Sequence, residues 1–250
     1  MRRVALLAVL LGACRFPGIV LPEGDLLHAV HLRGASDVPV VALTFDDGPN
    51  GRCTADVLDA LADVGARATF FVLGANVDAG GNDDVLARMV REGHTIGLHG
   101  YHHQGKMLVS GPTLHAELER TTASIAAALS RTGVAAPAGP RLFRPPFGFL
   151  TESTAAVAAG DGFTIVLWTI SVRDWEHGTS ADTIVERILA RVGPGDVIVL
   201  HDGERTHQRD RTSCTDRAAV AAAVRGLVPA LSERGLRVAP LSEVLRLPPG

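Results

Sequence analysis

Asp46 and Asp47 stand side by side at the point where an apolar run, VVALTF at residues 40–45, ends. Two neighbouring carboxylates repel each other, and burying either one without a partner is costly. One interpretation is a turn that keeps both side chains in water. The other is that a cation binds one carboxylate while the second carboxylate takes part in proton transfer. The remaining motifs favour the second interpretation.

His99 and His103 are four residues apart, a spacing that places two imidazoles on one face of a helical turn, roughly 5–6 Å apart at Cβ. Surface helices carry such pairs by chance, but the spacing is also common for two ligands of one ion. A carboxylate from another strand end would complete a site of two imidazoles and one carboxylate, and we expect Asp47 to be that ligand. Zinc is the first expectation, and cobalt and manganese accept the same donors.

Other polar residues that follow apolar runs would supply the proton transfer. Asp46 is then left to act as the general base, and Arg144 is available to orient it. His201 also ends an apolar run and is suited to be the general acid that protonates a leaving group. A nearby carboxylate should raise the pKa of this imidazole, and Asp174 is the candidate.

From about residue 38, apolar runs of strand length alternate with helical patterns. Strands are expected at residues 38–45, 67–72, 95–98, 141–143, 163–168, 196–200 and 236–238, and helices at 54–64, 83–92, 113–131, 151–159, 181–191 and 216–234. This alternation predicts βαβ units and a parallel sheet buried on both faces. We expect a closed or nearly closed α/β barrel, with an open doubly wound sheet as the alternative. In a barrel, the polar clusters would converge at the carboxyl ends of the strands.

The composition suits one large domain, because 46% of the 250 residues are hydrophobic. A formal charge of −3 gives no support for a nucleic-acid partner. The N-terminal MRRVALLAVLLGAC has two arginines and an apolar run too short to span a bilayer, which is typical of an export signal. An uncleaved anchor or a short buried helix is the alternative.

The last four residues of this stretch, LGAC, resemble the lipobox of bacterial lipoproteins, in which the cysteine is lipidated. The sequence therefore predicts an exported protein of the cell envelope, periplasm or exterior, with membrane association through a lipid on Cys14 as one outcome. We expect residues 1–14 to be the signal or anchor, residues 15–37 a lead-in segment, and residues 38–250 the folded domain. The sequence carries no signal for an oligomeric state.

Taken together, the motifs resemble those of the polysaccharide deacetylase family, also known as the NodB-homology domain or carbohydrate esterase family four. The resemblance rests on TFDDGP (44–49), HxxxH (99–103), RPPFG (144–148), DW (174–175) and VIVLHD (197–202), and it covers roughly residues 38–245. It implies a distorted (β/α) barrel of about seven parallel strands. It also implies metal-dependent hydrolysis of N- or O-linked acetyl groups on a polysaccharide such as peptidoglycan or a chitin-like glycan, and it assigns the roles given above.

The resemblance adds three residues and shows three departures. It implies that the main-chain N–H of Phe147 helps to hold the oxyanion, and that Trp175 and Val199 wall the groove and the acetyl pocket. Gly100 replaces the usual Ser or Thr that braces the ligand loop, so a looser loop is expected. Phe147 replaces the commoner Tyr, and Ser171 replaces the first acid of a DxxDW pattern.

Two other classes of function remain as alternatives. One is a metal-dependent hydrolase of cyclic imides or ureides, although relatives of that kind usually lack an export signal and vary the first motif. The other is a glycan-binding module without turnover. A binding module needs neither a base nor an acid, so the candidate base and acid argue against this alternative. Exposed aromatic side chains would favour glycan binding, but aromatic residues make up only 4% of the chain.

Cys53 follows the first strand's motif, and Cys214 follows the last one. In a closed barrel the first and last strands are neighbours, so both loops would border the same face. A Cys53–Cys214 disulfide is therefore our hypothesis, and it suits an exported protein. The alternative is a pair of unpaired buried thiols.

Overall fold

The computed structural model describes residues 30–105, 110–149, 151–203, 214 and 217–247. The predicted signal and its Cys14 lie outside this set, as does most of the predicted lead-in segment. Within the described ranges, the helices are too short or too polar for any of them to cross a lipid bilayer.

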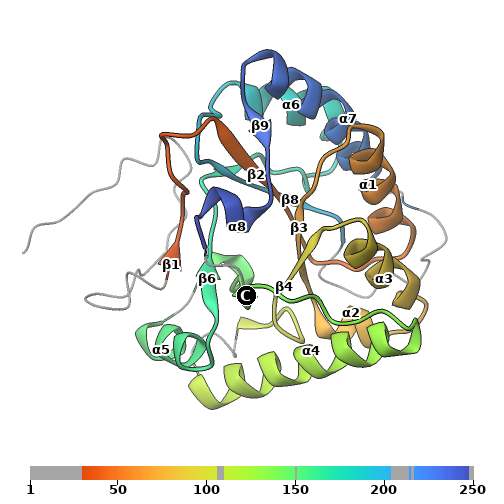
Figure 1. The fold of residues 1–250 in the computed structure, drawn as a ribbon, viewed down its shortest axis with the longest axis vertical. Helices are drawn as coiled ribbons and strands as arrows, with labels where there is room; N and C mark the ends of the chain where they lie inside the picture. Colours follow the sequence, from red (N-terminus) through yellow and green to blue (C-terminus); the bar gives the residue numbers. More distant parts are fainter. Residues whose placement is uncertain (1–29, 106–109, 150, 204–213, 215–216, 248–250) are drawn as a thin grey trace, which may run out of the picture.

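A nine-stranded parallel sheet forms the framework of the fold, and its strands curl around a common interior (Figure 1). The strands are β1 (Val30–His31), β2 (Val40–Asp46), β3 (Thr69–Val72), β4 (Thr95–Leu98), β5 (Leu142–Phe143), β6 (Thr164–Val166), β7 (Ile170–Ser171), β8 (Val197–His201) and β9 (Arg237–Val238). Their order is β1-β6-β5-β4-β3-β2-β8-β7, with β9 paired to β2. Every pairing is parallel, and the curled sheet confirms the predicted distorted barrel, with nine described strands where about seven were expected. The order ends at β1 and β7, so the barrel is open between these two strands.

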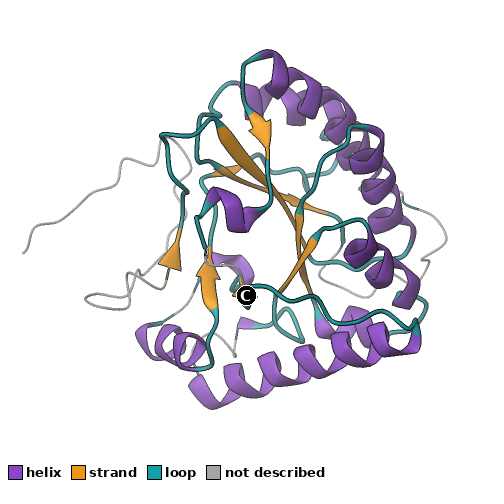
Figure 2. Ribbon diagram, in the orientation of Figure 1, coloured by secondary structure: helices purple, strands orange, loops and turns teal. Residues whose placement is uncertain are grey.

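Helices surround the outer face of this sheet, as the arc of coiled ribbons in Figure 2 shows. They are α1 (Arg52–Asp63), α2 (Gly74–Asp78), α3 (Asp83–Arg91), α4 (Gly111–Arg131), α5 (Glu152–Gly160), α6 (Ala181–Leu189) and α7 (Ala218–Glu233), with a 3₁₀ turn at Pro146–Gly148. The short helix α8 (Leu241–Val244) lies inside the curl instead (Figure 1), where its Leu241 and Val244 share an apolar cluster with Val40 and Ala42 of β2. Local sequence sets where several of them begin. Ser110 caps α4 by accepting the N–H of Thr113, and Ser180 caps α6 in the same way.

The alternation of side chains along each strand decides which residues face the interior of the curl. On β2, Leu43 and Phe45 belong to the core packed between sheet and helices, so Asp46 faces the other way, into the interior. On β8, Leu200 belongs to the same outer core, and His201 therefore shares the interior face with Asp46. The apolar pattern of the two strands thus directs both polar side chains to one place.

A disulfide joins Cys53 to Cys214, with a Cα–Cα distance of 4.7 Å and a sequence separation of 161 residues. Cys53 lies in the first turn of α1, shortly after the end of β2. Cys214 follows β8 in the chain. The bridge therefore links the segment after Asp46 and Asp47 to the segment after His201.

Candidate active site

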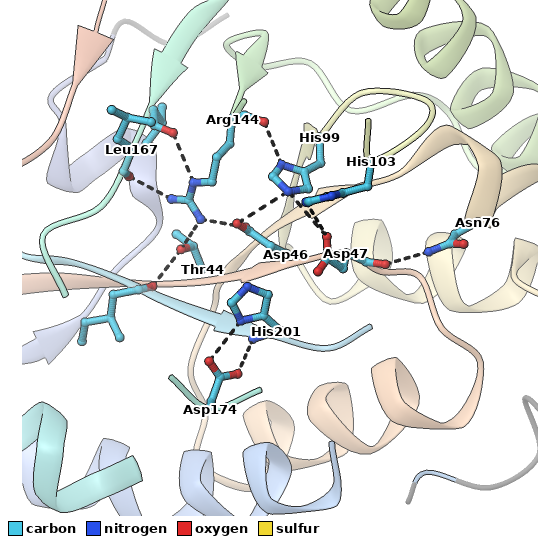
Figure 3. Close-up of polar contacts among 12 residues, drawn as sticks. Thr44, Asp46, Asp47, Asn76, His99, His103, Arg144, Leu167, Asp174 and His201 are labelled. Atoms are coloured by element: carbon cyan, nitrogen blue, oxygen red, sulfur yellow. Dashed lines mark hydrogen bonds and ion pairs between the residues drawn. The ribbon is translucent and has the colours of Figure 1, made fainter. Parts of the chain in front are cut away.

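Asp47, His99 and His103 come together at the carboxyl ends of β2 and β4 (Figure 3). Oδ1 of Asp47 lies 3.5 Å from Nε2 of each histidine, and the three ligand atoms are all within 4.8 Å of one another. Donor atoms bound to a tetrahedral zinc at about 2.0–2.2 Å would be roughly 3.3–3.6 Å apart. The donor set and its spacing therefore fit a divalent cation.

A hydrogen bond fixes the tautomer of His99. Its Nδ1 lies 2.7 Å from the main-chain oxygen of Arg144. Because a carbonyl oxygen can only accept, Nδ1 carries the proton and Nε2 presents its lone pair to the ligand cluster. His99 is also almost completely buried, which holds this orientation.

The backbone at Asp47 is held in an uncommon conformation, with φ at 73°. A non-glycine residue there costs on the order of 1–3 kcal/mol and needs support from its surroundings. Asn76 supplies it by donating from Nδ2 to the Asp47 carbonyl at 2.7 Å. Asn82 extends the support, because its Nδ2 donates to the Asn76 carbonyl at 2.8 Å and its Oδ1 accepts the Gly51 N–H at 3.0 Å. Two buried amides thus fix the carboxylate that would bind the cation.

Arg144 is fully buried and holds the second carboxylate of the pair. Its Nη1 donates to Oδ1 of Asp46 at 2.8 Å and to Oγ1 of Thr44 at 2.7 Å. The other two guanidinium nitrogens donate to main-chain oxygens, Nε to Val166 at 3.1 Å and Nη2 to Leu167 at 3.0 Å. Figure 3 shows Asp46 between Arg144 and His99. The guanidinium therefore balances the buried charge of Asp46 and fixes its direction.

Asp174 holds His201 through two contacts. Its Oδ1 lies 3.0 Å from Nδ1 of His201, and its Oδ2 accepts the His201 main-chain N–H at 2.8 Å. Burial by itself would lower the pKa of His201, but the charge and hydrogen bond of Asp174, with smaller contributions from Asp47 and Asp46, raise the pKa to about 9. The imidazole is therefore charged at neutral pH.

Two aromatic rings border these side chains. Trp175 packs edge-on against His201 with ring centroids 4.9 Å apart, and Phe147 packs edge-on against His103 at 4.4 Å. Phe147 is 48% exposed as a residue, and its backbone φ of 61° lies in the left-handed region. Val199 is buried on β8, two residues before His201. All the residues that the motifs single out thus lie at one end of the sheet.

Asp202 belongs to this region and was not identified from the sequence. Its buried carboxylate accepts a hydrogen bond from Oγ1 of Thr54 at 2.6 Å, and its main-chain N–H donates to the Asp46 carbonyl at 3.2 Å. Burial, opposed by the Thr54 hydrogen bond and assisted by the charges of Asp47 and Asp46, raises the pKa of Asp202 to about 7. The HD pair at the end of the VIVLHD run was the available signal for it.

Asp202 also explains the glycine of the TFDDGP motif. A Cβ placed on Gly48 would lie 2.3 Å from Oδ2 of Asp202. Only glycine therefore allows the turn after Asp47 to pass over this carboxylate. The support that Asn76 and Asn82 give to Asp47 could not be predicted from the sequence. An asparagine that is buried and bonded to the main chain has the same sequence signature as one in an exposed turn.

Comparison with known proteins places these features in a family. The polysaccharide deacetylase family model matches residues 33–166, a range that ends before Asp174 and His201. A chitooligosaccharide deacetylase of Bradyrhizobium sp. is 36% identical over 205 residues, which cover 82% of this chain and 90% of the relative. A peptidoglycan-N-acetylglucosamine deacetylase of Bacillus cereus is 32% identical over 219 residues, covering 88% of this chain and 73% of the relative.

Solved structures agree with the sequence comparison. The crystal structure of the Bc1960 peptidoglycan N-acetylglucosamine deacetylase superposes with a TM-score of 0.76 at 29% identity, covering 88% of this chain and 94% of that one. The chain belongs to the polysaccharide deacetylase family.

Proposed function

We propose that this protein is a metal-dependent hydrolase that removes acetyl groups from an acetylated polysaccharide. One observation carries the proposal. A ligand set for a cation, a carboxylate held by arginine and a histidine held by a carboxylate meet at one end of a parallel sheet. Membership of the family supports the reaction class, and the names of the relatives supply the substrate class.

The cation would be bound by Asp47, His99 and His103. A divalent ion there supplies a Lewis acid that polarises the acetyl carbonyl and activates water. Zinc suits two imidazoles and one carboxylate, and cobalt or manganese would be accepted by the same donors.

Asp46 is the proposed general base. Arg144 occupies its Oδ1, so Oδ2 is the atom that accepts a proton from the attacking water. Oδ2 lies 4.0 Å from Nε2 of His99, on the side of the ligand cluster. The main-chain N–H of Phe147 would donate to the oxyanion that forms from the acetyl oxygen.

His201 is the proposed general acid. Its Nδ1 proton is engaged by Asp174, so the proton delivered to the leaving amine or alkoxide is the one on Nε2. Acetate and the deacetylated sugar are then the products. Trp175 and Phe147 would form walls of the glycan groove, and Val199 would line the pocket for the acetyl methyl group.

The substrate that we propose is an N-acetylated glycan of the peptidoglycan or chitin type. The relatives that match most of this chain are named for chitooligosaccharides and for peptidoglycan N-acetylglucosamine. We propose that the predicted signal exports the protein to the cell envelope or the exterior, with Cys14 as a lipid attachment point. Residues 38–250 are the proposed catalytic domain, to which β1 adds a strand by pairing with β6. The Cys53–Cys214 disulfide supports an oxidising compartment.

The proposal is tested by acetate release from N-acetylated chitooligosaccharides, peptidoglycan and acetylated xylan, using protein that begins at residue 15. Each assay is run as purified, after chelation, and with metal restored. We expect release that chelation abolishes and metal restores. One bound metal per chain with no acetate from any glycan would contradict the proposal and favour a cyclic-imide hydrolase or a binding module.

A further inference from the structure

The carboxylate of Glu117 on α4 contacts the loop that connects His99 to His103. Its Oε2 accepts the main-chain N–H of Tyr101 at 2.8 Å and that of His102 at 2.7 Å. Its Oε1 lies 2.9 Å from Nδ1 of His102. The Glu117 side chain is only 11% exposed. One carboxylate therefore holds two consecutive peptide groups between the two proposed metal ligands.

The opposite side of the same loop is held by the start of α2. The N–H of Gly74 donates to the Gly100 carbonyl at 3.1 Å, and the N–H of Ala75 donates to the Tyr101 carbonyl at 3.0 Å. Both main-chain polar groups of Tyr101 are thus bonded, one to α2 and the other to Glu117. Removing Glu117 would leave the loop held on one side.

The Tyr101 side chain ties the loop to the same two helices. Its hydroxyl donates to Oδ2 of Asp78 at 2.9 Å and accepts from Nη2 of Arg120 at 2.8 Å. The Arg120 guanidinium also lies 3.6 Å from the centre of the Tyr101 ring. These contacts set the position of Tyr101 but leave the peptide groups of Tyr101 and His102 dependent on Glu117.

Gly100 contributes no side chain to this loop, and its φ of 88° is one that residues with a Cβ rarely adopt. The residue directly after His99 therefore cannot brace the loop itself. We infer that Glu117 is the positioning residue that fixes the His99–His103 loop and so sets the metal affinity of the site, an inference that rests on the proposed metal-dependent function.

The physical reason is that metal affinity depends on how firmly the ligands are held before the ion arrives. Loss of a group that orients a ligand commonly costs 10- to 100-fold in affinity or activity. Here the oriented unit is the loop, because His103 follows the two peptide groups that Glu117 accepts from. A loop released on that side would present His103 in a range of positions.

Binding of Co²⁺ tests the inference, because the visible absorption of the bound ion reports the geometry of its ligands. Protein from residue 15 is titrated with Co²⁺ against a competing chelator for wild type, Glu117→Ala, Glu117→Gln and Glu117→Asp. Glu119→Ala is the matched control, because Glu119 lies on the same helix, is 56% exposed and pairs at 3.5 Å with Arg141, away from the loop. Acetate release gives kcat and KM for the same proteins.

We expect Glu117→Ala to bind Co²⁺ 10- to 100-fold more weakly, with an altered spectrum and a lower kcat at similar KM. Glu117→Gln keeps an oxygen for both N–H groups and an amide for His102, so its Co²⁺ affinity should stay within about 3-fold of the wild-type value. The Co²⁺ affinity of Glu119→Ala should stay within the same range. Glu117→Asp keeps the negative charge, but its side chain is one methylene shorter and reaches less far toward the loop. Its Co²⁺ affinity should therefore lie between those of Glu117→Gln and Glu117→Ala.

Wild-type affinity and spectrum in Glu117→Ala would overturn the inference, as would equal losses in Glu117→Ala and Glu119→Ala. If Glu117→Ala does not fold, the Co²⁺ affinities of Glu117→Gln and Glu117→Asp are compared instead. An affinity closer to wild type in Glu117→Asp than in Glu117→Gln would overturn the inference. Failure of the proposed function is distinguishable, because wild-type protein would then bind no Co²⁺ or release no acetate.

Discussion

Asp46 and His201 are register partners at the carboxyl ends of two neighbouring parallel strands, β2 and β8. Each has its own fixed counter-ion, Arg144 for Asp46 and Asp174 for His201. A base and an acid can work at one pH only when their surroundings keep one deprotonated and the other protonated. Strand pairing brings the two groups together, and the two counter-ions give them opposite charge.

The pH dependence of turnover should follow His201. Its pKa of about 9 in the folded protein lies above the ordinary value of 6.5, so the stabilisation from Asp174 is fully present below pH 6.5 and is lost as pH rises through about 9. Because the acid must carry its proton, kcat/KM should fall over the same rise. A bound cation adds positive charge and moves this limb to lower pH, so variants are compared with the same metal.

Asp174→Asn tests the cause of that pKa. Without the carboxylate, only the smaller contributions of Asp47 and Asp46 oppose the effect of burial, so the pKa of His201 falls. The alkaline limb should therefore move to lower pH, and kcat should fall. The measurement is kcat/KM for acetate release from pH 5 to 10 in both proteins. An alkaline limb that stays in place would show that His201 is not the group that titrates.

Replacement of Arg144 should cost both stability and activity. Arg144→Met leaves the buried Asp46 carboxylate without its cation, and breaking a buried pair in this way costs about 3–5 kcal/mol. Urea unfolding should show that loss, and kcat/KM should fall with it. Arg131→Ala breaks an exposed pair with Asp83 and should cost about 0–1 kcal/mol. Equal losses in the two variants would contradict the account.

The Cys53–Cys214 disulfide should be countable and stabilising. Protein from residue 15 contains only these two cysteines, so thiol titration without reductant should find none free. The double variant Cys53→Ser/Cys214→Ser should lower the free energy of unfolding by about 2–5 kcal/mol, because the bridge closes a loop with a sequence separation of 161 residues. Two free thiols in the oxidised protein would refute the bridge.

Most of the fold could be predicted from the sequence because long elements have a clear period. The predicted strands and helices differ from those in the structure by at most two residues at either end, as in residues 38–45 against Val40–Asp46. The strand β1 was missed because it lies before residue 38, in the segment expected to be a lead-in. The strand β7 was missed because only residues 167–169 separate it from β6, so it forms no apolar run of its own. The helices α2 and α8 contain five and four residues, too few to show a helical period.

The candidate site was predictable where chemistry-bearing side chains follow strands, as at Asp46, His99 and His201. The residues that orient them were not. Glu117 lies on a helix whose sequence pattern is that of an ordinary amphipathic surface helix. Only the tertiary packing brings its carboxylate to the loop between His99 and His103. Asn76 likewise acts through a main-chain oxygen that no sequence pattern marks.

Asp46 is expected to move a proton while other residues hold the metal, and the substitution Asp46→Asn separates these two roles. The measurement is acetate release from N-acetylated chitooligosaccharide or peptidoglycan, whichever the wild type deacetylates, with bound metal counted in the same samples. We expect one metal per chain in both proteins and acetate release lower by about 10²- to 10⁴-fold in the variant. Wild-type acetate release by Asp46→Asn with its metal bound would contradict it.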